Sequence, residues 1–142
     1  MEDTHTRSTV MPALRYRDAH AAIDWLCRVL GFTRQAVYPG PDNTVAHAQL
    51  TLGGGMVMLG SGKDDAYSQG FRPPAELGHL ETRSVYLVVE DIDAAWARVQ
   101  AAGATILRPL QSTDYGSREF TVQDPEGHSW SLGTYNPWLS HE

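Results

Sequence analysis

Cysteine is almost absent from this sequence, since Cys27 is the only one among 142 residues. A single thiol excludes a disulfide bond within the chain and agrees with a reducing, cytoplasmic location. Apolar runs are short, and none approaches the roughly 18 residues that a membrane-spanning helix needs. The opening stretch, MEDTHTRST, lacks the apolar segment of a secretory signal peptide. The sequence therefore predicts a cytoplasmic protein that has no membrane partner.

Basic residues are also scarce. Eleven Lys and Arg stand against 17 Asp and Glu, which gives a formal net charge of −6. The cations are scattered along the chain, whereas nucleic-acid binding needs them clustered against phosphates. We therefore expect no nucleic-acid partner. The apolar content of 42% and the charged content of 20% are typical of one ordinary globular domain, covering residues 1–142.

Familiar catalytic motifs are missing as well. The sequence contains neither the HxH nor the HExxH spacing that places histidines on a metal ion. It also lacks the GxSxG turn that presents a nucleophilic serine in hydrolases. A serine hydrolase of that type is therefore unsupported.

The most informative stretch that is present is YGSREFTVQDPEGHSWSLGTY, at 115–135. Apolar and polar residues alternate on both sides of a DPEG sequence at 124–127, whose Asp, Pro and Gly fit a type I turn. Two such runs predict an antiparallel hairpin with one apolar and one polar face. The polar face carries Ser129, Ser131 and Gly133. It is either plain solvent-facing sheet or the floor of a pocket.

The order of predicted elements occurs twice. In each half a strand leads to an Asp that begins a helix, a Gly ends the helix, and three strands follow. Asp18 and Asp91 are 73 positions apart, and Gly31 and Gly103 are 72 apart. Each half is too small to bury a core alone, so the two halves, or two chains, must share a sheet and enclose something between them. The predicted modules span about 9–60 and 83–135, and a loop at 61–82 connects them.

Three stretches carry a resemblance to a known family: LRYRDAHAAIDWLCRVLGF at 14–32, VYLVVEDIDAAWARVQAAGA at 85–104 and FTVQDPEGHSWSL at 120–132. They resemble the vicinal-oxygen-chelate superfamily, which includes glyoxalase I, bleomycin-resistance proteins and extradiol dioxygenases. TDYGSREF at 113–120 resembles uncharacterised bacterial members and PhnB-like proteins. The resemblance implies an α+β fold, in which tandem βαβββ modules form a curved eight-stranded mixed sheet around a cavity, with the helices outside. It also implies a homodimer whose halves complete each other's cavities.

In metal-using members of that superfamily, four inward-facing side chains hold a divalent ion. The resemblance maps these positions to Met11, Met58, Ser84 and Ser131. Met11 and Ser84 are 73 positions apart, as are Met58 and Ser131, so the map obeys the repeat. A divalent ion needs imidazole, carboxylate or thiolate ligands, which thioethers and hydroxyls do not replace. We therefore expect no metal at this place, and no other cofactor.

A small-molecule ligand suits these positions better. Flexible thioethers and aromatic rings with few polar groups favour a flat or amphipathic molecule, although the same side chains could simply fill the core. Arg118 either anchors an anionic or carbonyl group or pairs with Asp114 on the surface. The predicted ligand-binding residues are Met11, Gln49, Met58, Ser84, Tyr86, Tyr115, Arg118 and Ser131.

His47 and Glu119 are 72 positions apart and lie on the polar sides of equivalent strands. They are either an acid and base pair for metal-free catalysis or ordinary polar groups. The sequence thus favours a metal-independent small-molecule-binding protein of the bleomycin-resistance type, which sequesters a drug or a metabolite. The alternative is a glyoxalase-like lyase or related enzyme for a small carbonyl or glutathione-linked substrate. Such an enzyme would use relocated metal ligands or the His47 and Glu119 pair.

Overall fold

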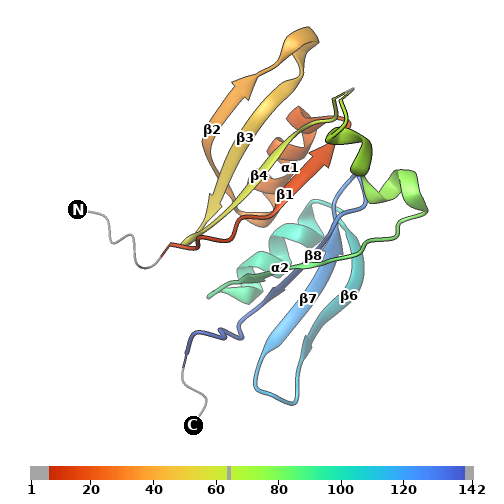
Figure 1. Cartoon of the computed structure of the whole chain (residues 1–142). Coiled ribbons are helices and arrows are strands. Elements are labelled where there is room, and N and C mark those ends of the chain that lie inside the picture. The colour runs from red at the N-terminus through yellow and green to blue at the C-terminus, as the bar shows by residue number, and fades with distance from the viewer. Residues whose placement is uncertain (1–6, 64, 140–142) are drawn as a thin grey trace.

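The computed structural model describes residues 7–63 and 65–139, and these form two βαβββ modules (Figure 1). Module 1 consists of β1 (Ala13–Tyr16), α1 (Ala19–Leu30), β2 (Thr33–Pro39), β3 (Val45–Leu52) and β4 (Gly55–Ser61). Module 2 consists of β5 (Val85–Val88), α2 (Ile92–Ala101), β6 (Thr105–Ser112), β7 (Arg118–Gln123) and β8 (Ser129–Gly133). Short 3₁₀ helices are η2 (Pro41–Asn43), η3 (Ser68–Gly70) and η4 (Pro74–Leu77). The predicted α+β class and the duplicated element order are confirmed.

The eight strands lie in two four-stranded mixed sheets, ordered β1-β4-β3-β2 and β5-β8-β7-β6. Within each sheet the first strand pairs in parallel with the last, and the other pairings are antiparallel. The eight strands that we expected in one curved sheet are thus divided between the modules. Among the described residues, neither α1 nor α2 has the length and apolarity needed to cross a membrane.

The helices begin and end where the sequence predicts. The Asp18 carboxylate accepts a hydrogen bond from Ala21 N at 3.1 Å, and the Asp91 carboxylate accepts one from Ala94 N at 3.0 Å. These side chains satisfy backbone donors that have no partner inside the first helical turn. Gly31 ends α1 with a φ of 87°, a left-handed conformation that a side chain would strain.

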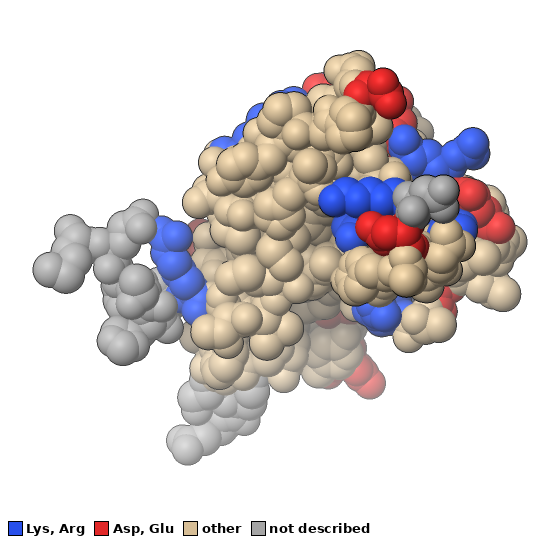
Figure 2. Space-filling model, turned by 45° about the horizontal axis from the view of Figure 1, so that its top comes forward, with Lys and Arg blue, Asp and Glu red and all other residues tan. Residues whose placement is uncertain are grey.

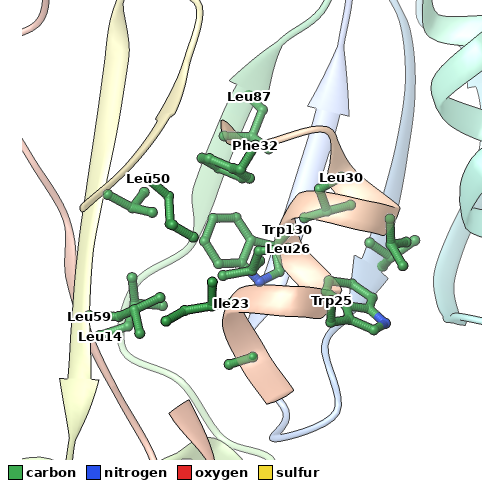
Figure 3. Close-up of a cluster of buried hydrophobic side chains, with 14 of the residues drawn as sticks. Leu14, Ile23, Trp25, Leu26, Leu30, Phe32, Leu50, Leu59, Leu87 and Trp130 are labelled. Carbon is green, nitrogen blue, oxygen red and sulfur yellow. The ribbon is translucent and has the colours of Figure 1, made fainter. Parts of the chain in front are cut away.

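One apolar core joins the two modules. Trp130 of β8 is fully buried, and its ring meets Phe32 of module 1 edge to face, with centroids 5.7 Å apart. Figure 3 shows both rings beside the α1 residues Ile23 and Leu26. The helices also contact each other, and Arg98 Nε of α2 donates to Val29 O of α1 at 3.3 Å. The two modules thus bury one core together, although their strands form two sheets and not the shared sheet that we expected.

The DPEG turn between β7 and β8 ties module 2 to module 1 through Asp124, which is 4% exposed. Its carboxylate accepts hydrogen bonds from Tyr16 Oη of β1 at 2.5 Å and from Trp130 Nε1 at 3.1 Å. The carboxylate also accepts from the backbone N–H groups of Glu126 and His128, both at 3.0 Å. A buried carboxylate is tolerated only when its lone pairs are satisfied in this way. We call these four donors and their acceptor the Asp124 cluster.

Three further contacts join the turn, and the residue that follows it, to β1 and to the corner between β1 and α1. The Glu126 carboxylate accepts from Arg17 N at 2.6 Å and from Asp18 N at 2.9 Å. His128 Nε2 lies 3.2 Å from the carbonyl oxygen of Arg15. The DPEG turn, which stands out in the sequence, therefore holds the two modules together.

Replacing the acceptor should destabilise the protein more than replacing one donor. We expect Asp124→Ala to lower the free energy of unfolding by about 3 kcal/mol or more, because four donors lose their partner and two of them, Tyr16 Oη and Trp130 Nε1, form buried hydrogen bonds. Tyr16→Phe removes a single donor and should cost about 1–2 kcal/mol. Urea denaturation measures both, with exposed Asp114→Ala as the control. A cost for Asp124→Ala no larger than that of the control would contradict the role of the cluster.

The cluster also predicts how stability changes at high pH. Burial, and then the charge of the Asp124 carboxylate, raise the pKa of Tyr16 well above its ordinary value of 10.0. The unfolded chain therefore loses this proton at a lower pH than the folded chain does. The stabilisation should be complete below pH about 10 and should decline as pH rises beyond it. Tyr16→Phe should show a shallower decline in denaturation curves recorded across that range, and an equal slope in both proteins would contradict the assignment.

Candidate functional site

Each sheet turns one face to the core and the other away from it. Phe120, Val122, Trp130 and Leu132 are all fully buried, so their neighbours along β7 and β8 point to the opposite side. The same alternation holds in β3, where Ala48 and Leu50 are buried. We define the module 1 face by Gln35, Tyr38, His47, Gln49 and Met58. We define the module 2 face by Tyr86, Arg108, Tyr115, Glu119, Thr121 and Ser131.

The module 1 face is a short chain of hydrogen bonds. His47 Nε2 lies 2.9 Å from Gln49 Oε1, so this nitrogen carries the proton and donates it to the amide oxygen. The Gln49 amide nitrogen in turn donates to Gln35 Oε1. The Tyr38 ring stacks on the imidazole, with centroids 6.0 Å apart and planes 24° apart. His47 is therefore oriented by neighbours within its own module.

The module 2 face contains a nearly buried carboxylate, since Glu119 is 6% exposed. Tyr115 Oη donates to Glu119 Oε1 at 2.8 Å, and Arg108 Nη2 lies 4.0 Å from the same oxygen. Tyr115 is therefore the closer partner of the Glu119 carboxylate, and Arg108 forms at most a long ion pair with it. Arg108 Nε donates to Thr121 Oγ1 at 3.0 Å, and this hydroxyl lies 2.9 Å from Ser131 Oγ. The face is thus a connected polar network beneath an exposed aromatic ring.

Tyr86 lies against β8 because position 133 has no side chain. A Cβ atom at Gly133 would approach Tyr86 Oη to 2.5 Å and Glu119 Cγ to 2.8 Å. The Tyr86 hydroxyl donates to Tyr135 O at 2.7 Å. Gly133 therefore lets the ring pack beside Glu119 on the module 2 face.

A cavity of about 350 Å³ lies where the two modules meet. Ser84 and Tyr86 line it from module 2, and Met56 lines it from module 1. Its other walls come mainly from apolar residues, among them Val10 and Phe32. We call it the junction cavity. Its few polar groups among apolar walls match the usual composition of small-molecule sites.

The four positions that the resemblance maps to a metal carry unsuitable donors. Met58 is registered opposite Ala13, and Ser131 is registered opposite Tyr86, whereas Met11 and Ser84 precede their strands by one or two residues. The Ser131 hydroxyl is already hydrogen-bonded to Thr121. Two thioethers and two hydroxyls do not fit a divalent ion. Within residues 7–63 and 65–139, no group of three His, Cys, Asp or Glu could hold one either.

The predicted site residues are only partly brought together. Ser84 and Tyr86 share the junction cavity, and Tyr115 and Glu119 are hydrogen-bonded to each other. His47 and Glu119 lie on separate sheets, and the contacts described for each come from its own module. Met11 is 39% exposed and precedes β1.

Arg118 lies elsewhere. It shares the parity of buried Phe120, so it projects from the helix side of β7. There Arg118 Nη1 donates to the Asp93 carboxylate of α2 at 3.0 Å. Asp93, and not the Asp114 that we considered from the sequence, is therefore the partner of Arg118. Arg118 is therefore remote from the module 2 face.

Sequence patterns did not identify Arg108 or Gln35. The pairing of β6 with β7 shifts register on both sides of Arg108, and the pairing of β2 with β3 shifts between Arg34 and Ala36. Such a shift changes which side chains share a face, so strict alternation misplaces them. Pairing β6 with β7 with these register shifts included places Arg108 opposite Thr121. That pairing is the signal that would have identified Arg108.

Comparison with known proteins identifies relatives that cover most of the chain. A sequence model of the Glyoxalase/Bleomycin resistance protein/Dioxygenase superfamily matches residues 7–132. Uncharacterized proteins from Mycobacterium bovis and Mycobacterium tuberculosis are 35% identical over 122 residues, which is 86% of this chain and 80% and 71% of theirs. The crystal structure of TioX from Micromonospora sp. ML1 is 32% identical with a TM-score of 0.69, covering 91% of this chain and 99% of that one.

More distant structures share the fold alone. The fosfomycin resistance protein FosX from Listeria monocytogenes superposes with a TM-score of 0.67 at 10% identity, covering 92% of this chain and 94% of that one. At so low an identity, the superposition carries no information on which ligand is bound or which reaction is performed.

The contact between Tyr115 and Glu119 can be tested by titration. The hydrogen bond to Glu119 is the largest of the effects that raise the pKa of Tyr115. Glu119→Gln should therefore bring this pKa down toward its ordinary value. Nuclear magnetic resonance of ring-labelled tyrosines measures the change, and exposed Glu90→Gln is the matched control. A Tyr115 pKa that is the same in all three proteins would show that the contact does not form in solution.

Proposed function

The chain belongs to the glyoxalase/bleomycin resistance protein/dioxygenase superfamily, and on that premise we propose that it binds an amphipathic small molecule without a metal ion. The observation that carries the proposal is the junction cavity, where Ser84, Tyr86 and Met56 meet. At about 350 Å³ the cavity is within the size range of ligand pockets, at its lower end. A flexible thioether and an aromatic ring favour a flat apolar body, and the serine hydroxyl supplies a polar point.

Binding without a metal is supported by the donor chemistry. The positions of Met11, Met58, Ser84 and Ser131 offer no imidazole, carboxylate or thiolate. A ligand must then be held by burial of apolar surface and by a few hydrogen bonds. Such a protein needs affinity alone, and we propose that it sequesters a drug or metabolite, as a resistance protein of this superfamily would.

We propose that a second copy of the chain completes the site. Large hydrophobic side chains remain exposed on both faces, with Tyr38 at 55% and Tyr115 at 57%. Exposed apolar surface of this kind favours association. The module 1 face of one copy would then cover the module 2 face of the other, and Tyr86 would lie both in this contact and in the wall of the junction cavity.

The enzymatic alternative depends on the same arrangement. His47 and Glu119 lie on different sheets, and a second copy whose module 1 face covered the module 2 face would bring its His47 to the Glu119 of the first. The buried Glu119 carboxylate beside Tyr115 is the feature that favours this alternative. His47→Ala should abolish turnover of a substrate if the pair is catalytic, and it should leave affinity for a sequestered ligand largely unchanged.

A thermal-shift screen on chelator-treated protein tests the proposal. The probes are zinc and nickel salts, S-alkyl glutathione conjugates and bleomycin-type glycopeptides. A compound that binds the folded state raises the melting temperature by mass action. We expect an organic probe to raise it in the absence of metal, and metal salts to leave it unchanged.

Two variants locate the bound compound. Tyr86→Ala should weaken binding about tenfold, because it removes an aromatic wall of the junction cavity. Tyr67→Leu is the matched control, since Tyr67 is 61% exposed and lies outside that cavity. Equal affinities for both variants, or shifts that appear only when metal is added, would contradict the proposed site.

A further inference from the structure

A second cavity, of about 250 Å³, lies under the segment that connects the modules. Its lining includes Arg15 from β1, Arg72 and Arg83 from the connecting segment, and His128 next to β8. Figure 2 shows acidic and basic side chains gathered mainly at the right of the view, whereas its broad central part carries few. We call it the Arg15 cavity. It differs in character from the junction cavity, whose lining contains no charged residue.

Arg15 is the unusual member of this lining. Its Nε atom is buried and has no hydrogen-bond partner among the described residues. The guanidinium carbon lies 5.4 Å from the centroid of the Tyr67 ring, which holds the group by a cation–π contact. Buried donors are nearly always paired in folded proteins, so an unpaired one indicates that an acceptor is missing. The acceptor that suits a guanidinium best is a carboxylate or phosphate oxygen.

The other cations reinforce the positive character of the cavity. Arg72 Nη1 donates to the carbonyl oxygens of Ser68 at 2.9 Å and Phe71 at 2.7 Å, so its position is fixed by the backbone. Arg83 is exposed and forms no ion pair with any described residue. Two arginines are therefore available to an anion, and a third is held beside them.

The nearby acidic groups are already engaged. The Glu81 carboxylate, which also lines the cavity, accepts from Ser129 N at 3.1 and 3.2 Å. The Asp65 carboxylate accepts from Ser68 N at 2.8 Å, and hydrogen bonding to Ser68, more than the nearby charge of Arg15, lowers the pKa of Asp65. Both carboxylates hold the connecting segment in place through backbone donors. They leave the buried Arg15 Nε without a partner.

The remaining walls are apolar and partly open to solvent. Phe71, Pro74, Leu77 and Leu80 line the cavity, and Leu80 is 74% exposed. Exposed leucines beside an arginine pair match a ligand that has an apolar body and an anionic group. A volume of 250 Å³ is below that of sites for drug-sized molecules, so the ligand is about the size of one ring.

We propose that the Arg15 cavity binds a small organic carboxylate. Its carboxylate would pair with Arg15 and Arg83, and its apolar body would pack against Leu77 and Leu80. This inference does not rest on the function proposed for the junction cavity, because the two cavities share only Pro12 and Val85 in their linings.

Titration of the whole chain with benzoate, followed by nuclear magnetic resonance or calorimetry, tests the inference. Benzamide has the same shape without the charge, and inorganic phosphate has charge without the apolar body. We expect saturable binding of benzoate, and affinities at least about tenfold weaker for benzamide and phosphate. No saturable benzoate binding, or equal binding of benzamide, would overturn the proposal. Equal binding of phosphate would overturn the role of the apolar wall.

Variants assign the site. Arg15→Gln and Arg83→Gln should each weaken benzoate binding at least about fivefold, whereas Arg28→Gln, an exposed arginine paired with Asp24, should not. A melting curve checks that each variant folds, and exposed Arg83→Gln decides the question if Arg15→Gln does not. Tyr86→Ala should leave benzoate binding unchanged, which separates this site from the junction cavity. Benzoate affinity unaffected by Arg83→Gln would place the ligand elsewhere.

Discussion

The hydrogen bonds that converge on the Asp124 carboxylate determine how the two modules are joined. Asp124 belongs to the DPEG turn of module 2, and its Tyr16 partner belongs to the first strand of module 1. Neither module is large enough to bury a core alone, so the apolar faces of both sheets must meet around the helices. A buried charge with four donors specifies one geometry for that meeting, because any displacement leaves donors unpaired. The Glu126 carboxylate adds two bonds at the same corner.

The way in which the modules join determines which surfaces remain available for binding. Because one side of each sheet is buried in the core, the module 1 face and the module 2 face point away from it. They carry the histidine, the buried glutamate and most of the exposed tyrosines that sequence patterns singled out. The cavities lie between the modules, where residues before and within β1 lie beside residues before and within β5.

Much of the fold could be predicted from the sequence, because the residues that begin and end helices recur in both halves of the chain. Asp18 and Asp91 mark the helix starts, and Gly31 marks the end of the first helix. The alternation around the DPEG turn correctly assigned the core and polar faces of β7 and β8. The role of Asp124 was missed because the type I turn alone accounts for an Asp at this position. Its long-range partner Tyr16 has no feature in the sequence that distinguishes it from other strand residues. Arg108 was missed because bulges shift the register of its strand.

We propose that this member of the superfamily binds a small molecule without a metal ion at the four positions mapped from metal-using members. It rests on four positions that carry thioethers and hydroxyls, of which Ser131 is already hydrogen-bonded to Thr121. Elemental analysis of protein purified without chelators, from cells grown with added zinc, nickel and iron, tests it most directly. We predict less than about one metal ion per ten chains, since the part of the chain that the structure describes holds no donor set of suitable chemistry. One ion per chain that survives dialysis would contradict it.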